Sequence, residues 1–230
     1  MNLIVAFAGI VAGILVWWLA VRRLTTRSWE AQGTYDGRDS ANLMGIEPAR
    51  IGLWIFLAVV TSLFALFIAA YSIRMSPQPQ QGVVLRDWRP VVEPSILWVN
   101  TALLLVSSLG MQFARNAIGR GQVGRASSGM LAGGVFAVAF LVGQLLAWRQ
   151  LQAAGYYAAG NPANAFFYVL TGLHGLHLTG GLVVLCRSGA RMSRPGVSPG
   201  AVRLGIELCT VYWHYLLVVW LVLFGLLLIT

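Results

Sequence analysis

The stretch AFFYVLTGLHGLHLTGGLVVLC, residues 165–186, decides the fold class. It contains no Asp, Glu, Lys or Arg, and at 1.5 Å per residue its 22 residues form a helix of about 33 Å. That length crosses the hydrocarbon core of a bilayer, which is about 30 Å thick. Its apolar residues do not alternate as barrel strands require, and a helix satisfies its own backbone hydrogen bonds in lipid. The stretch therefore predicts a transmembrane helix.

Further apolar runs of similar length lie on both sides of this stretch. They cover approximately residues 3–20, 51–73, 95–114, 130–148 and 206–229. Over the whole chain 58% of residues are hydrophobic and 10% are charged, whereas soluble proteins carry about 25% charged residues. These observations exclude a water-soluble fold. They predict an all-α integral membrane protein, a bundle of about six transmembrane helices.

The spacing of the runs suggests three segments. We expect an N-terminal transmembrane helix at 1–24, a polar cytoplasmic linker at 25–50 and a five-helix membrane domain at 51–230. The first run lacks the positive n-region of a secretory signal, so we expect the mature protein to retain it.

Arginines predict the orientation of the chain. All 16 basic residues are arginine, and twelve of them fall in the connections 21–50, 115–129 and 187–205. The positive-inside rule puts these connections in the cytoplasm and both termini on the outer side, in a bacterial-type inner membrane. Because the arginines do not cluster along one helix or face, nucleic-acid binding is not expected, and contact with anionic lipid explains the net charge of +9.

Histidines within the apolar runs suggest either a cofactor site or helix packing. His174 and His177 share one helix face, as do Glu207 and His214, and equal depths let His177 and His214 meet. Histidines from two facing helices ligate haem in a small haem b electron carrier, whereas neutral imidazoles also hydrogen-bond between helices. We favour hydrogen bonding. Three histidines are too few for a haem-copper centre plus a second haem.

Other polar and small residues indicate packing rather than chemistry. Cys186 and Cys209 form no CxxC motif and are interpreted as small core residues. Glycines in the fourth and fifth runs, counted from the N-terminus, predict close helix approach. No dinucleotide, Walker-type or nucleophile-elbow motif occurs, so we expect no catalytic residue, no metal ligand and no cofactor in this chain.

Residues 166–181, FFYVLTGLHGLHLTGG, resemble a signature of cytochrome c oxidase subunit III. Four other stretches resemble motifs of the same family in the same order. They are GLWIFLAVVTSLFALFIAAY (52–71), LWVNTALLLVSS (97–108), AFLVGQLLAW (139–148) and IELCTVYWHYLLVVW (206–220). The resemblance covers roughly residues 50–230.

The resemblance implies a non-catalytic subunit of a haem-copper terminal oxidase, which passes electrons from cytochrome c to dioxygen and translocates protons. Its partners would be subunit I, subunit II and phospholipids held in a V-shaped cleft, with the haems and copper in the partner subunits. The subunit would stabilise the complex, support proton uptake and protect the catalytic site during turnover. Quinol oxidase subunit III and the accessory protein of nitric oxide reductase share these motifs and remain alternatives.

The resemblance also assigns particular residues. His174, His177, Glu207, Trp213 and His214 match signature positions in the polar cluster between the last two helices. Arg187, Arg191 and Arg203 are candidate contacts to lipid headgroups.

Departures from the family pattern bear on proton transfer. Val60, Ala147 and Leu217 stand where the family often has carboxylates, which makes a proton path through this chain doubtful. The single N-terminal run also differs from the two helices, or none, that precede the five motif-bearing helices in family members.

Overall fold

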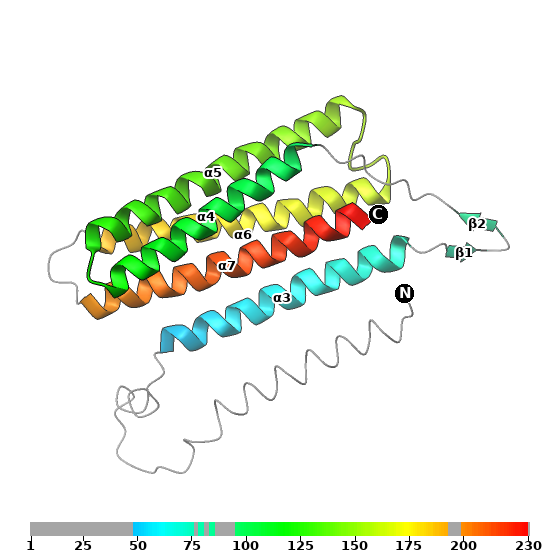
Figure 1. Cartoon of the computed structure of the whole chain (residues 1–230). Coiled ribbons are helices and arrows are strands. Elements are labelled where there is room, and N and C mark those ends of the chain that lie inside the picture. Colours follow the sequence, from blue (N-terminus) through cyan, green and yellow to red (C-terminus); the bar gives the residue numbers. More distant parts are fainter. Residues whose placement is uncertain (1–47, 76–77, 81–82, 86–94, 193–198, 230) are drawn as a thin grey trace, which may run out of the picture. The chain divides into compact units, whose positions relative to one another are not determined.

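The computed structural model describes residues 48–75, 78–80, 83–85, 95–192 and 199–229 (Figure 1). Within these residues lie five long helices: α3 (Pro48–Met75), α4 (Ile96–Gly119), α5 (Val123–Ala153), α6 (Pro162–Met192) and α7 (Pro199–Ile229). All five are long and apolar enough to cross a membrane, which confirms five of the predicted spans. The sixth, at residues 3–20, lies outside the described residues.

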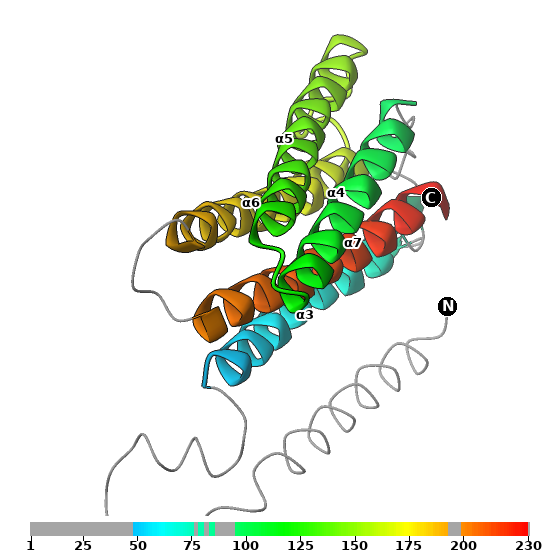
Figure 2. The same ribbon diagram turned by 60° about the vertical axis from the view of Figure 1, so that its left-hand side comes forward.

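The chain divides into two compact units, residues 1–58 and 59–230, and the boundary falls within α3. In the second unit, α4 contacts α5 and α7, and α6 contacts α5 and α7, so these four helices close into a ring (Figure 2). The part of α3 beyond Val59 joins this ring through a separate apolar cluster. Val60, Phe64 and Tyr71 pack there with Leu170 of α6 and Leu223 of α7.

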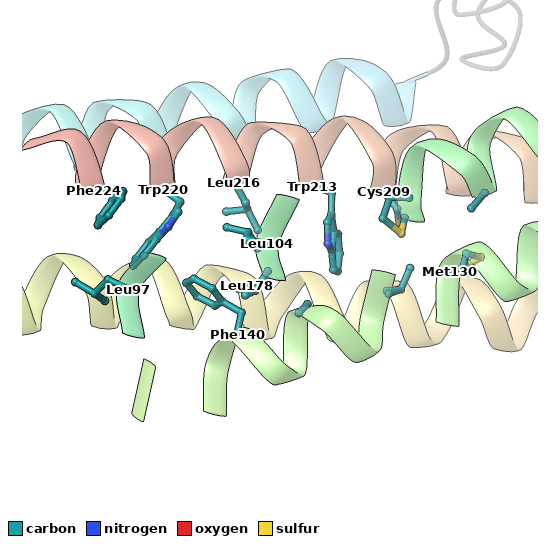
Figure 3. Close-up of a cluster of buried hydrophobic side chains, with 14 of the residues drawn as sticks. Leu97, Leu104, Met130, Phe140, Leu178, Cys209, Trp213, Leu216, Trp220 and Phe224 are labelled. Atoms are coloured by element: carbon teal, nitrogen blue, oxygen red, sulfur yellow. The ribbon is translucent and has the colours of Figure 1, made fainter. Parts of the chain in front are cut away.

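The main core lies inside the four-helix ring. Buried side chains of α7 recur at helical spacing and point toward α4, α5 and α6 (Figure 3). Trp220 meets Phe140 edge to face, with ring centroids 4.8 Å apart. Because lipid tails are as apolar as the core, such packing contacts and interhelical hydrogen bonds hold the helices together.

Helices α4 and α5 approach each other so closely that their backbones touch. A Cβ atom built on Gly129 would lie 2.8 Å from the backbone nitrogen of Ala114 and 2.9 Å from the carbonyl oxygen of Gly110. One built on Gly110 would lie 3.0 Å from the backbone nitrogen of Gly133. No residue larger than glycine fits at Gly110 or Gly129 without a shift of the backbone. The sequence predicted close helix approach in this part of α5, at Gly133, whose backbone nitrogen lies at the crossing.

Helix ends extend beyond the apolar runs. The predicted connection 115–129 is helical over most of its length, because only Arg120–Gln122 separates α4 from α5. Gly121 adopts φ +73°, a left-handed conformation that suits glycine and allows this short turn. The last three residues of the predicted linker, Pro48–Arg50, already belong to α3.

Two further details differ from the sequence expectation. The loop after α3 contains an antiparallel pair of short strands, β1 (Gln78–Gln80) and β2 (Val83–Leu85), so the described chain is not entirely helical. Cys209 is a core residue as predicted, but Cys186 is exposed on α6, because its side chain falls on the rim of the helix face that meets α5.

The close crossing yields a stability prediction. Gly129→Ala should lower the free energy of unfolding by about 1–3 kcal/mol, because the added methyl group meets backbone atoms that cannot rotate away. Gly124→Ala, on the same helix with nothing within 4 Å of the added Cβ, is the matched control. Thermal unfolding of both variants in detergent measures the difference; equal stabilities would contradict the crossing.

Candidate functional site

The residues of the predicted polar cluster lie on α6 and α7 but face different neighbours. His214 on α7 binds α4: Ser108 Oγ contacts its Nδ1, and its Nε2 lies 3.0 Å from Gln112 Oε1. Gln112 Nε2 in turn donates to Asn116 Oδ1 at 3.2 Å. A polar chain therefore runs along α4 from the core towards the end of that helix.

The direction of this chain determines the tautomer of His214. Gln112 uses its amide nitrogen to donate to Asn116, so its Oε1 is an acceptor toward the ring. His214 Nε2 then carries the proton, and Nδ1 accepts from the Ser108 hydroxyl. The neutral imidazole satisfies both of its nitrogens without any metal ligation.

Trp213 forms a second link, which reaches across three helices. Its indole Nε1 donates to Ser107 Oγ of α4 at 2.8 Å, and the same hydroxyl donates to the Gly133 carbonyl oxygen of α5 at 2.6 Å. One turn earlier on α7, Thr210 Oγ1 lies 3.2 Å from the Met111 carbonyl oxygen of α4. Adjacent residues of α7 thus bind adjacent serines of α4.

His177 faces away from this polar chain. Its Nδ1 donates to the Leu173 carbonyl oxygen in its own helix at 2.8 Å, and its ring packs against Phe64 of α3 at 5.6 Å. The link between its backbone and α7 comes from Tyr212, whose hydroxyl donates to the His177 carbonyl oxygen at 2.9 Å. Although equal depths would let His177 and His214 meet, the first imidazole packs on α3 and the second binds α4.

His174 is fully buried between aromatic rings. Phe140 of α5 lies 5.6 Å from the imidazole and edge-on to it, and Trp220 of α7 lies 5.3 Å away. Neither ring nitrogen of His174 has a hydrogen-bond partner among the described residues. Aromatic faces accept N–H groups weakly, so His174 acts mainly as a flat packing element of the core.

The three imidazoles therefore face three different parts of the bundle. A haem held between helices requires two imidazoles that face one shared space. Here His174 faces the aromatic core, His177 faces α3 and His214 faces α4. Within the part of the chain that the structure describes, no three His, Cys, Asp or Glu side chains come together as a metal site.

Glu207 lies near the start of α7, close in sequence to Arg203. Its Oε1 accepts from Arg203 Nε at 2.9 Å, one turn earlier on α7. The side chain of Arg203 is 59% exposed to solvent, so this ion pair contributes little to the stability of the fold. Arg203 is thus partly engaged by a carboxylate, whereas Arg187 and Arg191 are exposed on α6.

The three positions that depart from the family pattern pack as apolar residues. Val60 is buried against α6 and α7, and Ala147 is buried in the main core. Leu217 is partly buried against the same core. A carboxylate at Val60 or Ala147 would be a costly charge in this packing.

Some contacting residues were not predicted. Tyr212 and Tyr215 supply hydroxyl groups between helices, the latter 3.0 Å from Thr61 Oγ1 of α3. Thr210 was also missed. Their position in the sequence could have identified them. All three lie within four residues of His214, on a helix that is otherwise mostly apolar.

Comparison with known proteins decides the family. The family model described as cytochrome c oxidase subunit III matches residues 2–229. A cytochrome c oxidase subunit 3 from Thermostichus vulcanus is 30% identical over 180 residues, 77% of this chain and 85% of the relative. The chain belongs to the cytochrome c oxidase subunit III family.

Other relatives agree with this membership. A cytochrome c oxidase subunit 3 from Synechocystis sp. is 29% identical over 87% of this chain and 84% of its own length. A cytochrome bo(3) ubiquinol oxidase subunit 3 from Pseudomonas putida is 26% identical over 76% and 82%. The family match also takes in residues 2–50, which carried none of the motifs recognised in the sequence. The chain is a multi-pass membrane subunit of a haem-copper oxidase.

The link between α4 and α7 yields a prediction. Ser108→Ala and His214→Leu should be coupled by about 0.6–1.7 kcal/mol in a double-mutant cycle of unfolding, since each removes the partner of the other. Ser128→Ala should leave stability nearly unchanged, because the hydroxyl it removes donates to the Gly124 carbonyl oxygen of the same helix, at 3.2 Å. Strictly additive effects of Ser108→Ala and His214→Leu would rule out the hydrogen bond.

Proposed function

We propose that this chain is the non-catalytic subunit III of a cytochrome c oxidase, and that it stabilises the complex during turnover. The observation that carries this proposal is the use of its polar side chains. Trp213 and His214 bind serines of α4, and His177 packs on α3. These groups join helices of the same subunit, so they support a structural role rather than a redox role.

The apolar side chains of Val60 and Ala147 also argue against a proton path through this chain. A relay through lipid needs ionisable or hydroxylic groups in sequence, and these two buried positions supply none. The polar chain from Ser108 to Asn116 is also a poor relay, because two of its four members are amides. Proton uptake by the complex would then use its other subunits.

The proposed partners are subunit I, which would carry the haems and copper, subunit II and phospholipids. We favour cytochrome c as the electron donor because the relatives from Synechocystis and Thermostichus are named cytochrome c oxidase subunits. The Pseudomonas relative, named a ubiquinol oxidase subunit, makes quinol the second candidate donor. Purified complex supplied with each donor separately distinguishes the two.

Loss of interhelical bonding should shorten the working life of the complex. With His214→Leu in the assembled oxidase, initial oxygen uptake should match the wild type, and fewer turnovers should precede inactivation, because α7 is bound less firmly to α4. Continuous oxygen-electrode recording gives both quantities, with Ser128→Ala as the control. Immediate loss of all activity in a fully assembled complex would contradict a non-catalytic role.

The proposed orientation places both termini on the outer side of a bacterial-type inner membrane, because twelve of the 16 arginines lie in the connections 21–50, 115–129 and 187–205. Alkaline phosphatase, which is active only outside the cytoplasm, should therefore be active when fused at the C-terminus. The same enzyme fused after Met192, at the end of α6, should be inactive. The reverse pattern would overturn the orientation.

A further inference from the structure

Three polar side chains inside the four-helix ring have buried atoms without a hydrogen-bond partner among the described residues. The atoms are Asn100 Oδ1 on α4, Gln144 Nε2 on α5 and both ring nitrogens of His174 on α6. Asn100 and His174 are fully buried, and only 3% of the surface of Gln144 is exposed. Because folded proteins pair nearly all of their buried polar groups, these atoms call for a partner.

The three side chains lie at one level of the ring. Asn100 Nδ2 donates to Gln144 Oε1 at 3.4 Å, which joins α4 to α5. On α7, Trp220 Nε1 donates at 2.9 Å to Oγ1 of Thr101, the residue after Asn100. The ring of the same tryptophan lies 5.3 Å from the imidazole of His174. Trp220 therefore puts His174 at the depth of Asn100 and Gln144.

Gln144 lies opposite His174 across the interface of α5 and α6. Along α5 it follows Phe140 by one turn and precedes Trp148 by one turn. Phe140, which projects into the ring interior in Figure 3, lies 5.6 Å from the imidazole of His174. Trp148 Nε1 donates at 3.1 Å to Thr171 Oγ1, one turn before His174 on α6. The buried side chain of Gln144 therefore faces the part of α6 that carries His174.

The aromatic neighbours of His174 cannot satisfy both of its nitrogens. A neutral imidazole has one N–H donor and one acceptor nitrogen. The faces of Phe140 and Trp220 accept an N–H group weakly, but they have no hydrogen to donate to the acceptor nitrogen. The indole N–H of Trp220 is already bound to Thr101. The acceptor nitrogen of His174 therefore needs a donor from elsewhere.

The kinds of unpaired atom identify the partner. Asn100 Oδ1 and one nitrogen of His174 need donors, which disfavours an anion, whereas the N–H groups of Gln144 Nε2 need an acceptor and disfavour a cation. The partner is then a neutral group that both donates and accepts. Water does both in the smallest volume, and a buried water typically makes about three hydrogen bonds. That number matches the three side chains.

We propose that Asn100, Gln144 and His174 bind one buried water molecule, which bridges α4, α5 and α6 inside the ring. The water donates to Asn100 Oδ1 and to the acceptor nitrogen of His174, and it accepts from Gln144 Nε2. The N–H group of His174 lies against the aromatic rings. The site is separate from the contact between Ser108 and His214, and it does not depend on the function proposed for the chain.

The test is solid-state NMR of the full chain with nitrogen-15-labelled histidine, reconstituted in lipid bilayers. The sequence contains three histidines, so the imidazole signals are assigned by replacing one histidine at a time. In the unaltered chain, the acceptor nitrogen of His174 should show the chemical shift of a hydrogen-bonded nitrogen. Magnetisation should also pass from water protons to this imidazole.

A pair of matched variants locates the water. Gln144→Leu removes one of the three groups that hold it, so the His174 signal should lose most of the transfer from water and its acceptor nitrogen should shift toward the free value. Gln150→Leu makes the same substitution at an exposed position of α5 and should change neither quantity. His214, whose ring nitrogens contact Ser108 and Gln112, should keep its shifts in both variants.

Three results would overturn the proposal. A free acceptor nitrogen on His174 in the unaltered chain would show a dry aromatic site. A hydrogen-bonded nitrogen without transfer from water would show a direct bond to a side chain such as Gln144. Undiminished transfer in Gln144→Leu would show that the water is held elsewhere. Oxidase activity has no part in these readouts, so failure of the water site and failure of the proposed function are distinguishable.

Discussion

Backbone contact between α4 and α5 is the constraint on which the rest of the bundle depends. Glycine at positions 110 and 129 lets the two backbones touch, and Gly133 leaves room for the side chain of Met111. The same approach lets Ser107 reach the Gly133 carbonyl oxygen, which fixes the rotation of α4. The polar face of α4 is thereby directed at α7, where Trp213 and His214 bind Ser107 and Ser108. In lipid, such close packing replaces the hydrophobic effect as the source of association.

The bundle divides its surfaces between two tasks. Inner faces carry aromatic rings and hydrogen bonds that bind helix to helix, as with Trp220, which packs on Phe140 and donates to Thr101 at 2.9 Å. Outer faces carry exposed aliphatic side chains such as Leu131 and Leu176, which suit lipid or neighbouring subunits. This division of surfaces is consistent with the structural role proposed for the subunit.

The main features of the fold were predictable from the sequence because lipid imposes a simple rule. Long uncharged runs must be helices, and the motif around His174 and His177 was enough to indicate the family. Helix ends were less predictable. Hydropathy marks the lipid boundary, but α5 begins at Val123, seven residues before its apolar run, because a helix continues into the interface where polar residues are tolerated.

The partners of the histidines were the least predictable part of the site. Spacing along α6 and α7 gives the depth of His177 and of His214, but depth does not report rotation about each helix axis. That rotation is determined by neighbours distant in sequence, namely Phe64 for His177 and Ser108 for His214. The exposure of Cys186 also depends on rotation, since its side chain falls on the rim of the helix face that meets α5.

The most direct test of the account is purification of the intact complex through an affinity tag on this chain. An optical spectrum and an oxygen-uptake assay are then made on the eluate in mild detergent. The account predicts haem bands that belong to a larger co-purifying subunit, together with cyanide-sensitive oxygen uptake. A colourless eluate, or haem bound to this chain when it is isolated from its partners, would contradict it.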